Sequence, residues 1–183
     1  MMDKLLTYIR SNLIPIYVGM DFNVEHMAAS MALNISGILY VFREYVDYYD
    51  TPELSTIIRE DFPNNKIICF PDSTGKNRGT TNAKTSDIAI LRKHKFTVRA
   101  KVKNPFVKDR IAAVNNAFNH KKLLIDVDRC PELTEALEQQ IYKTNGQPDK
   151  ESGLDHIVDS LGYLVSYLMP VREAKVKSVI TVG

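Results

Sequence analysis

The sequence has no tryptophan, only two cysteines and almost no excess charge, and each shortage excludes a class of protein. Cys69 and Cys130 lie far apart and form no Cys-x-x-Cys pair, so neither a zinc site nor a disulfide framework is expected. Two isolated thiols are typical of buried, reduced side chains in a reducing compartment. The net charge of +2 gives no indication of a partner by itself.

Long apolar runs are also missing. The most apolar stretch, residues 27–42, contains Asn34, Ser36 and Gly37, which favours two strands around a turn over a membrane span. No signal sequence is recognisable at the N-terminus. With 183 residues, of which 44% are hydrophobic, the chain is long enough for one globular domain with a full core. We therefore expect a cytoplasmic protein with no membrane partner.

Several familiar catalytic motifs are absent. Residues 72–77 read Asp-Ser-Thr-Gly-Lys-Asn, whereas a phosphate-binding loop needs a leading glycine and a Ser or Thr after Gly-Lys. ATP hydrolysis is therefore not expected of this chain. Residues 126–128 begin like a phosphatase nucleophile motif, but the residues that follow do not continue it. No serine-hydrolase elbow and no zinc-protease helix motif occurs.

The order of the expected elements predicts an α/β fold. Residues 15–22, 26–33 and 38–48 read as three strands with short connections, which implies an antiparallel meander. Helices and short strands then alternate, which is the pattern of parallel pairing, and one of these strands is expected over residues 95–102. The first of these helices spans residues 51–61, with Thr51 as its expected N-cap. The result is a mixed sheet flanked by helices.

The domain organisation is expected to be simple. One domain spans residues 14–169, preceded by a linker or leading helix at 1–13 and followed by a strand or tail at 170–183. The last helix, from residue 154 to 168, has apolar residues at alternating spacings of three and four, which is typical of a buried face. No repeat, low-complexity segment or internal boundary is visible.

Four aspartates in three places are the most informative feature. Asp21 ends one apolar run and Asp72 ends another, while Asp155 and Asp159 lie four apart beside the apolar face of the last helix. Carboxylates at strand ends and on a helix face can meet in one cleft. Clustered carboxylates are the hard oxygen ligands that Mg²⁺ and Mn²⁺ prefer. The pattern indicates two-metal phosphodiester chemistry.

Each of these residues also has a simpler interpretation. Asp21 and Asp72 can act as turn residues that accept backbone N–H bonds. Asp155 and Asp159 can stabilise the start of a helix, although this contributes only ~0.3–1 kcal/mol each and two acids four apart repel one another. His156 is either a surface or packing residue, or a residue that donates a hydrogen bond to a metal ligand or carries a proton.

The positive charge is concentrated in one segment. Residues 92–110 hold eight lysines and arginines against a single acid, Asp109. Such a segment is either a solvated surface or a groove that neutralises phosphates. The candidate phosphate contacts in and before this segment are Lys76, Arg78, Lys84, Lys101, Lys103 and Lys108.

Three motifs combine into a family resemblance. Residues 17–23 read Tyr-Val-Gly-Met-Asp-Phe-Asn, residues 71–78 read Pro-Asp-Ser-Thr-Gly-Lys-Asn-Arg, and residues 155–163 read Asp-His-Ile-Val-Asp-Ser-Leu-Gly-Tyr. Together they resemble the C-terminal nuclease domain of tailed-bacteriophage terminase large subunits, over roughly residues 14–168. Residues 104–115 are similar to that family's helix after its fifth strand. The resemblance implies a ribonuclease H-like mixed five-stranded sheet, with three antiparallel strands followed by parallel strands.

The resemblance also implies a function. Members of the family are Mg²⁺- or Mn²⁺-dependent endonucleases that cut concatemeric double-stranded viral DNA during genome packaging. Asp21, Asp72 and Asp159 match the ligands of two metal ions, and Asp155 or His156 matches a further ligand in some members. The implied partners are double-stranded DNA and, in the full protein, an ATPase domain, a small terminase subunit and the portal. The implied location is the host cytoplasm and not the mature virion.

Two departures from the family pattern leave alternatives open. Ser160 stands where the family more often has alanine, and the ATPase motor of a full terminase has no counterpart here, so the chain resembles an isolated nuclease domain. One alternative is a catalytically silent DNA-binding module of the packaging motor. Others are a different ribonuclease H-like nuclease, such as a junction resolvase or a transposase-type enzyme, and a phosphatase that does not act on nucleic acid.

Overall fold

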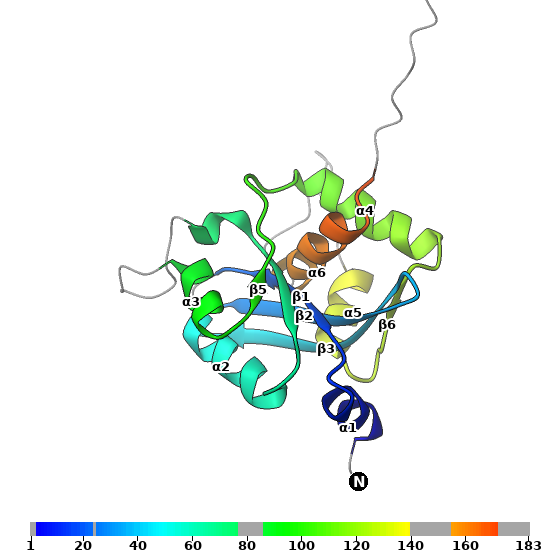
Figure 1. Ribbon diagram of the computed structural model, residues 1–183. Helices are drawn as coiled ribbons and strands as arrows, with labels where there is room; N and C mark the ends of the chain where they lie inside the picture. The colour runs from blue at the N-terminus through cyan, green and yellow to red at the C-terminus, as the bar shows by residue number, and fades with distance from the viewer. Residues whose placement is uncertain (1–2, 24, 77–85, 140–154, 172–183) are drawn as a thin grey trace, which may run out of the picture.

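The computed structural model describes residues 3–23, 25–76, 86–139 and 155–171 (Figure 1). The helices are α1 (Lys4–Ser11), α2 (Thr51–Asp61), α3 (Asp87–Lys93), α4 (Val107–Asn119), α5 (Pro131–Gln139) and α6 (Asp155–Leu168), with a short 3₁₀ helix, η1 (Ser73–Lys76). The strands are β1 (Ile16–Asp21), β2 (Met27–Ile35), β3 (Ile38–Tyr48), β4 (Ile67–Pro71), β5 (Thr97–Val98) and β6 (Leu123–Ile125).

The strands form one mixed sheet in the order β5-β4-β1-β2-β3-β6. β1, β2 and β3 are an antiparallel meander, and the pairs β1–β4, β4–β5 and β3–β6 are parallel. The predicted α/β fold, with antiparallel strands followed by parallel strands, is therefore confirmed. The sheet has six strands where five were expected, because the three-residue strand β6 pairs with the outer edge of β3.

Two local predictions need correction. The N-cap of α2 is Asp50, whose side chain accepts a hydrogen bond from the backbone N–H of Glu53, while Thr51 is the first helical residue. An aspartate caps a helix as well as a threonine does, so the sequence pattern fitted both positions. The strand expected over residues 95–102 is only two residues long, because the chain leaves β4 after Arg99 donates its N–H to Cys69.

Helices cover both faces of the sheet (Figure 1). Buried side chains of α1, α2 and α3 form one core with the sheet, and those of α4, α5 and α6 form a second core on the other face. None of the described helices combines the length and the apolar character needed to span a bilayer. Residues 4–11 form a helix, one of the two forms expected for residues 1–13. The proposed domain boundaries remain predictions, and residues 172–183 lie outside the described part.

The contact between β1 and α6 is unusually close. A Cβ atom added at Gly19 would lie 2.0 Å from the carbonyl oxygen of Ser160 and 2.9 Å from the Cβ of Leu164. Only glycine therefore allows the strand to reach the helix at this point. Ser160 itself is fully buried, and its hydroxyl donates to the carbonyl oxygen of Ile157 at 2.7 Å, so serine is accommodated here.

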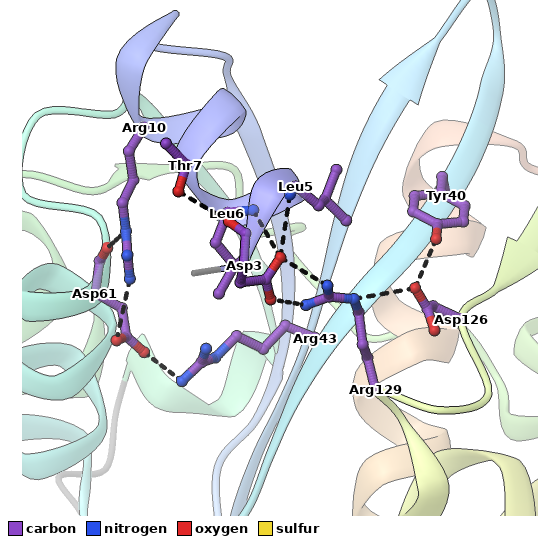
Figure 2. Close-up of polar contacts among 10 residues, drawn as sticks. All are labelled: Asp3, Leu5, Leu6, Thr7, Arg10, Tyr40, Arg43, Asp61, Asp126 and Arg129. Atoms are coloured by element: carbon purple, nitrogen blue, oxygen red, sulfur yellow. Dashed lines mark hydrogen bonds and ion pairs between the residues drawn. The ribbon is translucent and has the colours of Figure 1, made fainter. Parts of the chain in front are cut away.

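A second feature of the fold is a charged cluster beside α1, shown in Figure 2. Arg129 bridges Asp3, which caps α1, and Asp126. Asp61, at the end of α2, accepts from Arg10 and from Arg43, the latter at 2.6 Å. We call this cluster the α1 network; its members are Asp3, Arg10, Tyr40, Arg43, Asp61, Asp126 and Arg129. It ties the N-terminal helix to β3, α2 and the turn before α5.

Candidate metal-binding active site

Asp21 and Asp72 are neighbours because of strand register. Asp21 is the last residue of β1, and Asp72 follows β4 directly. Since these parallel strands place Met20 opposite Pro71, the next pair is Asp21 and Asp72, and the N–H of Asp72 donates to Met20 at 2.9 Å. Side chains alternate along a strand, so Asp21 shares the face of Gly19, which is the face that α6 covers.

The start of α6 brings His156 to Asp21. The Nδ1 atom of His156 lies 3.0 Å from Oδ2 of Asp21, and its Nε2 atom lies 3.0 Å from the side-chain amide nitrogen of Asn23. Because a carboxylate can only accept, Nδ1 carries the proton, and in the neutral ring Nε2 accepts from the amide. Asp155 lies 3.8 Å from Nε2. The histidine therefore links β1 to the acidic end of the helix.

Asp72 is held by the loop that precedes α4. The side-chain amide of Asn104 donates to Oδ1 of Asp72 at 2.5 Å, and its oxygen accepts from the N–H of Ser73 at 2.8 Å. The N–H of Thr74 also donates to Oδ1 of Asp72, at 2.7 Å. Asp72 therefore fulfils the turn role expected of it while it lies beside Asp21. The two interpretations of this residue are compatible.

Asp159 is held by a buried arginine of α4. Arg110, only 6% exposed, donates to Oδ1 of Asp159 at 2.7 Å and to the carbonyl oxygen of Pro105 at 3.2 Å. Its guanidinium group lies over the ring of Tyr163, 4.5 Å from the centroid. A Cβ atom at Gly162 would meet the Arg110 side chain at 3.2 Å, so the glycine leaves room for this arginine.

The pKa of Asp21 depends on its burial and on the charged groups around it. Burial raises the pKa of Asp21 above the ordinary aspartate value, the hydrogen bond from His156 opposes this, and the charges of Asp159 and Asp72 raise the pKa further. For Arg110, burial alone would lower the pKa, but the nearby charge of Asp159 outweighs it and the pKa is raised. Acids from β1, the end of β4 and α6 therefore share one electrostatic environment.

The side chains of this site are of the chemical type that binds hard divalent cations. Asp21, Asp72 and Asp155 are each at most 8% exposed, and carboxylate oxygens are the preferred ligands of Mg²⁺ and Mn²⁺. Among the described residues, however, no three His, Cys, Asp or Glu side chains already converge in a group that could hold a metal ion. Asp21, Asp72 and Asp159 instead bond to a histidine, an asparagine and an arginine. The ligand set therefore stays a prediction.

Three of the predicted phosphate contacts can be located. Lys101 lies against α6, where its Nζ atom donates to Ser166 at 3.2 Å. The Nζ atoms of Lys103 and Lys108 both lie over the ring of Phe106, at 5.5 and 5.9 Å from its centroid. The other three predicted contacts fall outside the described part of the chain: Arg78, Lys84 and the side chain of Lys76.

Sequence reasoning gave no individual role to Asn104 or Arg110. Arg110 was counted only as one charge of the basic segment. A signal was present, because Arg110, Ala113, Val114 and Ala117 follow the spacing of a buried helix face, and all four are buried in α4. An arginine on such a face needs an acidic partner. Asn104 carried no comparable signal, because an asparagine before a proline is typical of many turns.

Comparisons with known proteins support the architecture. A search of curated proteins gives no match. Among solved structures, the large terminase from a thermophilic bacteriophage superimposes with a TM-score of 0.68 at 19% identity, over 86% of this chain and 40% of that chain. The large terminase nuclease domain of bacteriophage P22 gives a TM-score of 0.63 at 14% identity, over 90% and 91% of the two chains.

A third structure, the g2p large terminase nuclease domain from bacteriophage SPP1 with bound Mn, gives a TM-score of 0.61 at 18% identity, over 91% and 92% of the chains. At these identities the likeness shows the fold, and the chain spans about 40% of the length of the thermophilic phage protein. A family model described as the terminase RNaseH-like domain matches residues 18–168, a range that includes all four aspartates. The chain therefore belongs to the terminase RNaseH-like domain family.

Proposed function

We propose that this chain is a Mg²⁺- or Mn²⁺-dependent endonuclease that cuts double-stranded concatemeric viral DNA during genome packaging. The observation that carries the proposal is the gathering of Asp21, Asp72 and Asp159 from three elements at the end of a buried strand. Among the described residues, the acids of this site, Asp155 included, pair with one arginine, Arg110, and one histidine, His156. The charges of Asp159 and Asp72 raise the pKa of Asp21, and bound divalent cations would relieve this repulsion between the carboxylates.

The metal ligands in this proposal are Asp21, Asp72, Asp159 and Asp155. The Mn bound in the SPP1 nuclease domain supports this class of metal. Two bound divalent ions supply a water nucleophile of lowered pKa and positive charge against the negative charge that develops on the phosphate and the leaving oxygen. The carboxylates that hold such ions need to be oriented in advance, because small misplacements are costly in rate.

The residues of the chain supply that orientation. Asn104 fixes one oxygen of Asp72, and Arg110 fixes one oxygen of Asp159. His156 holds the carboxylate of Asp21 through the proton on Nδ1. Partners of this kind commonly change metal affinity or activity by ~10–100-fold when they are removed. In this proposal these three residues therefore act on the metal ligands and do not contact the DNA.

DNA would be held by its phosphates. Lys101, Lys103 and Lys108 lie on or next to the loop that anchors Asp72, which supports contact with the strand being cut. Binding through phosphates is sensitive to salt and largely independent of sequence. The proposal also includes an ATPase domain, a small terminase subunit and the portal as partners in the full protein, and the host cytoplasm as its location.

The test is a plasmid-cleavage assay with Mn²⁺, with Mg²⁺ and with EDTA. We expect nicked and linear products with either metal, none with EDTA, and none from Asp21→Asn. A matched control is Asp128→Asn, which makes the same change at an exposed aspartate away from the site and should cleave like the wild type. Cleavage by Asp21→Asn at the wild-type rate would remove this residue from the metal site.

One observation favours the silent DNA-binding module as a second candidate. In the described residues no three potential ligands converge, and Asp21, Asp72 and Asp159 bond to other side chains of the chain. Duplex binding without cleavage in either metal would support that candidate. A four-way junction tested beside linear duplex separates a resolvase, which would cut the junction preferentially.

A further inference from the structure

The loop between β5 and α4, residues 99–106, has an exposed apolar tip within the most basic part of the chain. Val102 is 95% exposed and Phe106 is 63% exposed. Residues 95–108 contain five lysines and arginines and no acid. Exposed large apolar side chains that gather in one place mark a contact with a partner. The charge around these two indicates a polyanion, because a basic surface attracts phosphates, and the exposed Asp109 is the single acid of residues 92–110.

The ring of Phe106 organises the nearest charges. Both Lys103 and Lys108 place their ammonium groups within 6 Å of its centroid, the distance at which a cation and an aromatic face attract. Lysine side chains are flexible, and a phosphate contact normally costs the entropy of ordering them. Two ammonium groups already gathered on one ring lose less of that entropy when a phosphate chain binds.

The loop is also anchored to the candidate active site. Asn104, between the two exposed apolar residues, donates to Asp72 at 2.5 Å. Pro105 accepts from Arg110, which also holds Asp159. A ligand bound at the tip therefore lies on a loop whose backbone and side chains fix two of the four acids.

We infer that Lys103, Phe106 and Lys108 form a phosphate-binding site for the backbone of duplex DNA. The exposed ring of Phe106 and the methyl groups of Val102 pack against sugars or bases of the same DNA, as apolar side chains do in other basic DNA-binding surfaces. This inference rests on the proposed function, because it assigns the DNA contact that positions the substrate for the aspartates. It adds an aromatic residue to a surface that charge alone had indicated.

The experiment measures affinity for a short fluorescent duplex by anisotropy in EDTA, so that cleavage does not interfere, at several salt concentrations. Phe106→Ala should weaken binding roughly tenfold, because it removes the ring that gathers both ammonium groups and its apolar contact with the duplex. The double variant Lys103→Gln with Lys108→Gln should lower the slope of log affinity against log salt by about two, near 0.9 for each phosphate that is no longer neutralised.

A matched control is Ile35→Ala, which removes a 56% exposed apolar side chain from the end of β2. It should bind the duplex within twofold of the wild type. Because Phe106 is exposed, Phe106→Ala should also unfold at the wild-type temperature. A Phe106→Ala protein that is folded and weakened tenfold, beside an unchanged control, supports the inference.

The two proposals fail in different ways. If the wild type cleaves plasmid and both loop variants bind duplex with unchanged affinity and salt slope, the inference is overturned and the proposed function stands. If the wild type neither binds duplex nor cleaves plasmid, both are overturned; if it cleaves plasmid but does not bind duplex in EDTA, only the inference is overturned. If Phe106→Ala changes only the sedimentation of the protein and not its DNA affinity, the tip is a contact between protein chains, and the inference is overturned.

Discussion

The α1 network and the aspartate site are both clusters of charge, but their composition differs. The network consists of two groups: Arg129 pairs with Asp3 and Asp126, and Asp61 pairs with Arg10 and Arg43, so that three aspartates meet three arginines (Figure 2). In the site, four aspartates meet one arginine and one histidine among the described residues. A balanced cluster satisfies itself and fastens segments together. Acids that repel one another gain from an added cation, and this repulsion, more than charge density, distinguishes the proposed site.

The pKa values of two aspartates show the same difference. The hydrogen bond from Arg129 lowers the pKa of Asp3 to about 2, because the network favours the ionised carboxylate. Burial and neighbouring acids raise the pKa of Asp21, because the site disfavours that charge. The folded state therefore binds the proton of Asp21 more tightly than the unfolded state does, and its contribution to stability is lost as pH rises through the raised pKa.

The comparison is tested most strongly by two matched carboxylates, each bonded to an arginine at close range. Asp159 accepts from Arg110 at 2.7 Å, and Asp61 accepts from Arg43 at 2.6 Å. We expect Asp159→Asn to lower plasmid cleavage by ~10²–10³-fold, the scale of one electrostatic group in an active site. Asp61→Asn should leave cleavage within about twofold of the wild type. Equal plasmid-cleavage rates for the two variants would mean that Asp159 contributes no more to cleavage than Asp61 does.

The two arginines should differ in their effect on stability. Arg110→Met removes a buried cation from the partly buried Asp159 and should lower the free energy of unfolding in EDTA by about 3 kcal/mol. Arg43→Met removes a half-exposed cation from an acid that still has Arg10, and should cost about 1 kcal/mol or less. Urea denaturation followed by circular dichroism measures both values. A larger loss of unfolding free energy for Arg43→Met than for Arg110→Met would contradict this expectation.

Adding Mn²⁺ should raise the stability of the protein through the aspartate site and not through the α1 network. At a Mn²⁺ concentration of 100 times Kd, a single site adds about 2.7 kcal/mol to the free energy of unfolding. We expect this gain in the wild type and in Asp61→Asn, and a much smaller gain in Asp159→Asn. Thermal unfolding with and without Mn²⁺ provides the measurement. The same gain in all three proteins would place the bound metal elsewhere.

The smallest expected effect concerns acid stability. Since the pKa of Asp3 is lowered from 3.8 to about 2, its contribution to stability is complete above pH 3.8 and is lost as pH falls toward 2. Asp3→Asn has no carboxylate to protonate, so its stability should fall less steeply over this range than that of the wild type. Urea midpoints between pH 2 and 5 give both slopes. Parallel slopes would show that Arg129 does not bind Asp3 in solution.

Much of the fold was readable in the sequence because it depends on local pattern. The apolar runs before Asp21 and Asp72 became β1 and β4, and the three-and-four spacing became the buried face of α6. Short connections determined the antiparallel meander. Acids at the ends of neighbouring strands were also a sound indication of proximity, because register carries them to the same edge of the sheet.

The sequence by itself therefore determined the order of elements, the buried faces and the positions of the acids, since each follows from spacing over a few residues. Only the tertiary structure decided which side chain meets which. Arg110 and Asp159 are 49 positions apart, and His156 and Asp21 are 135 apart. The packing of α4 and α6 against the sheet determines such pairs. Burial makes an unpaired charge costly, and the packing decides which partner is close enough to pair with it.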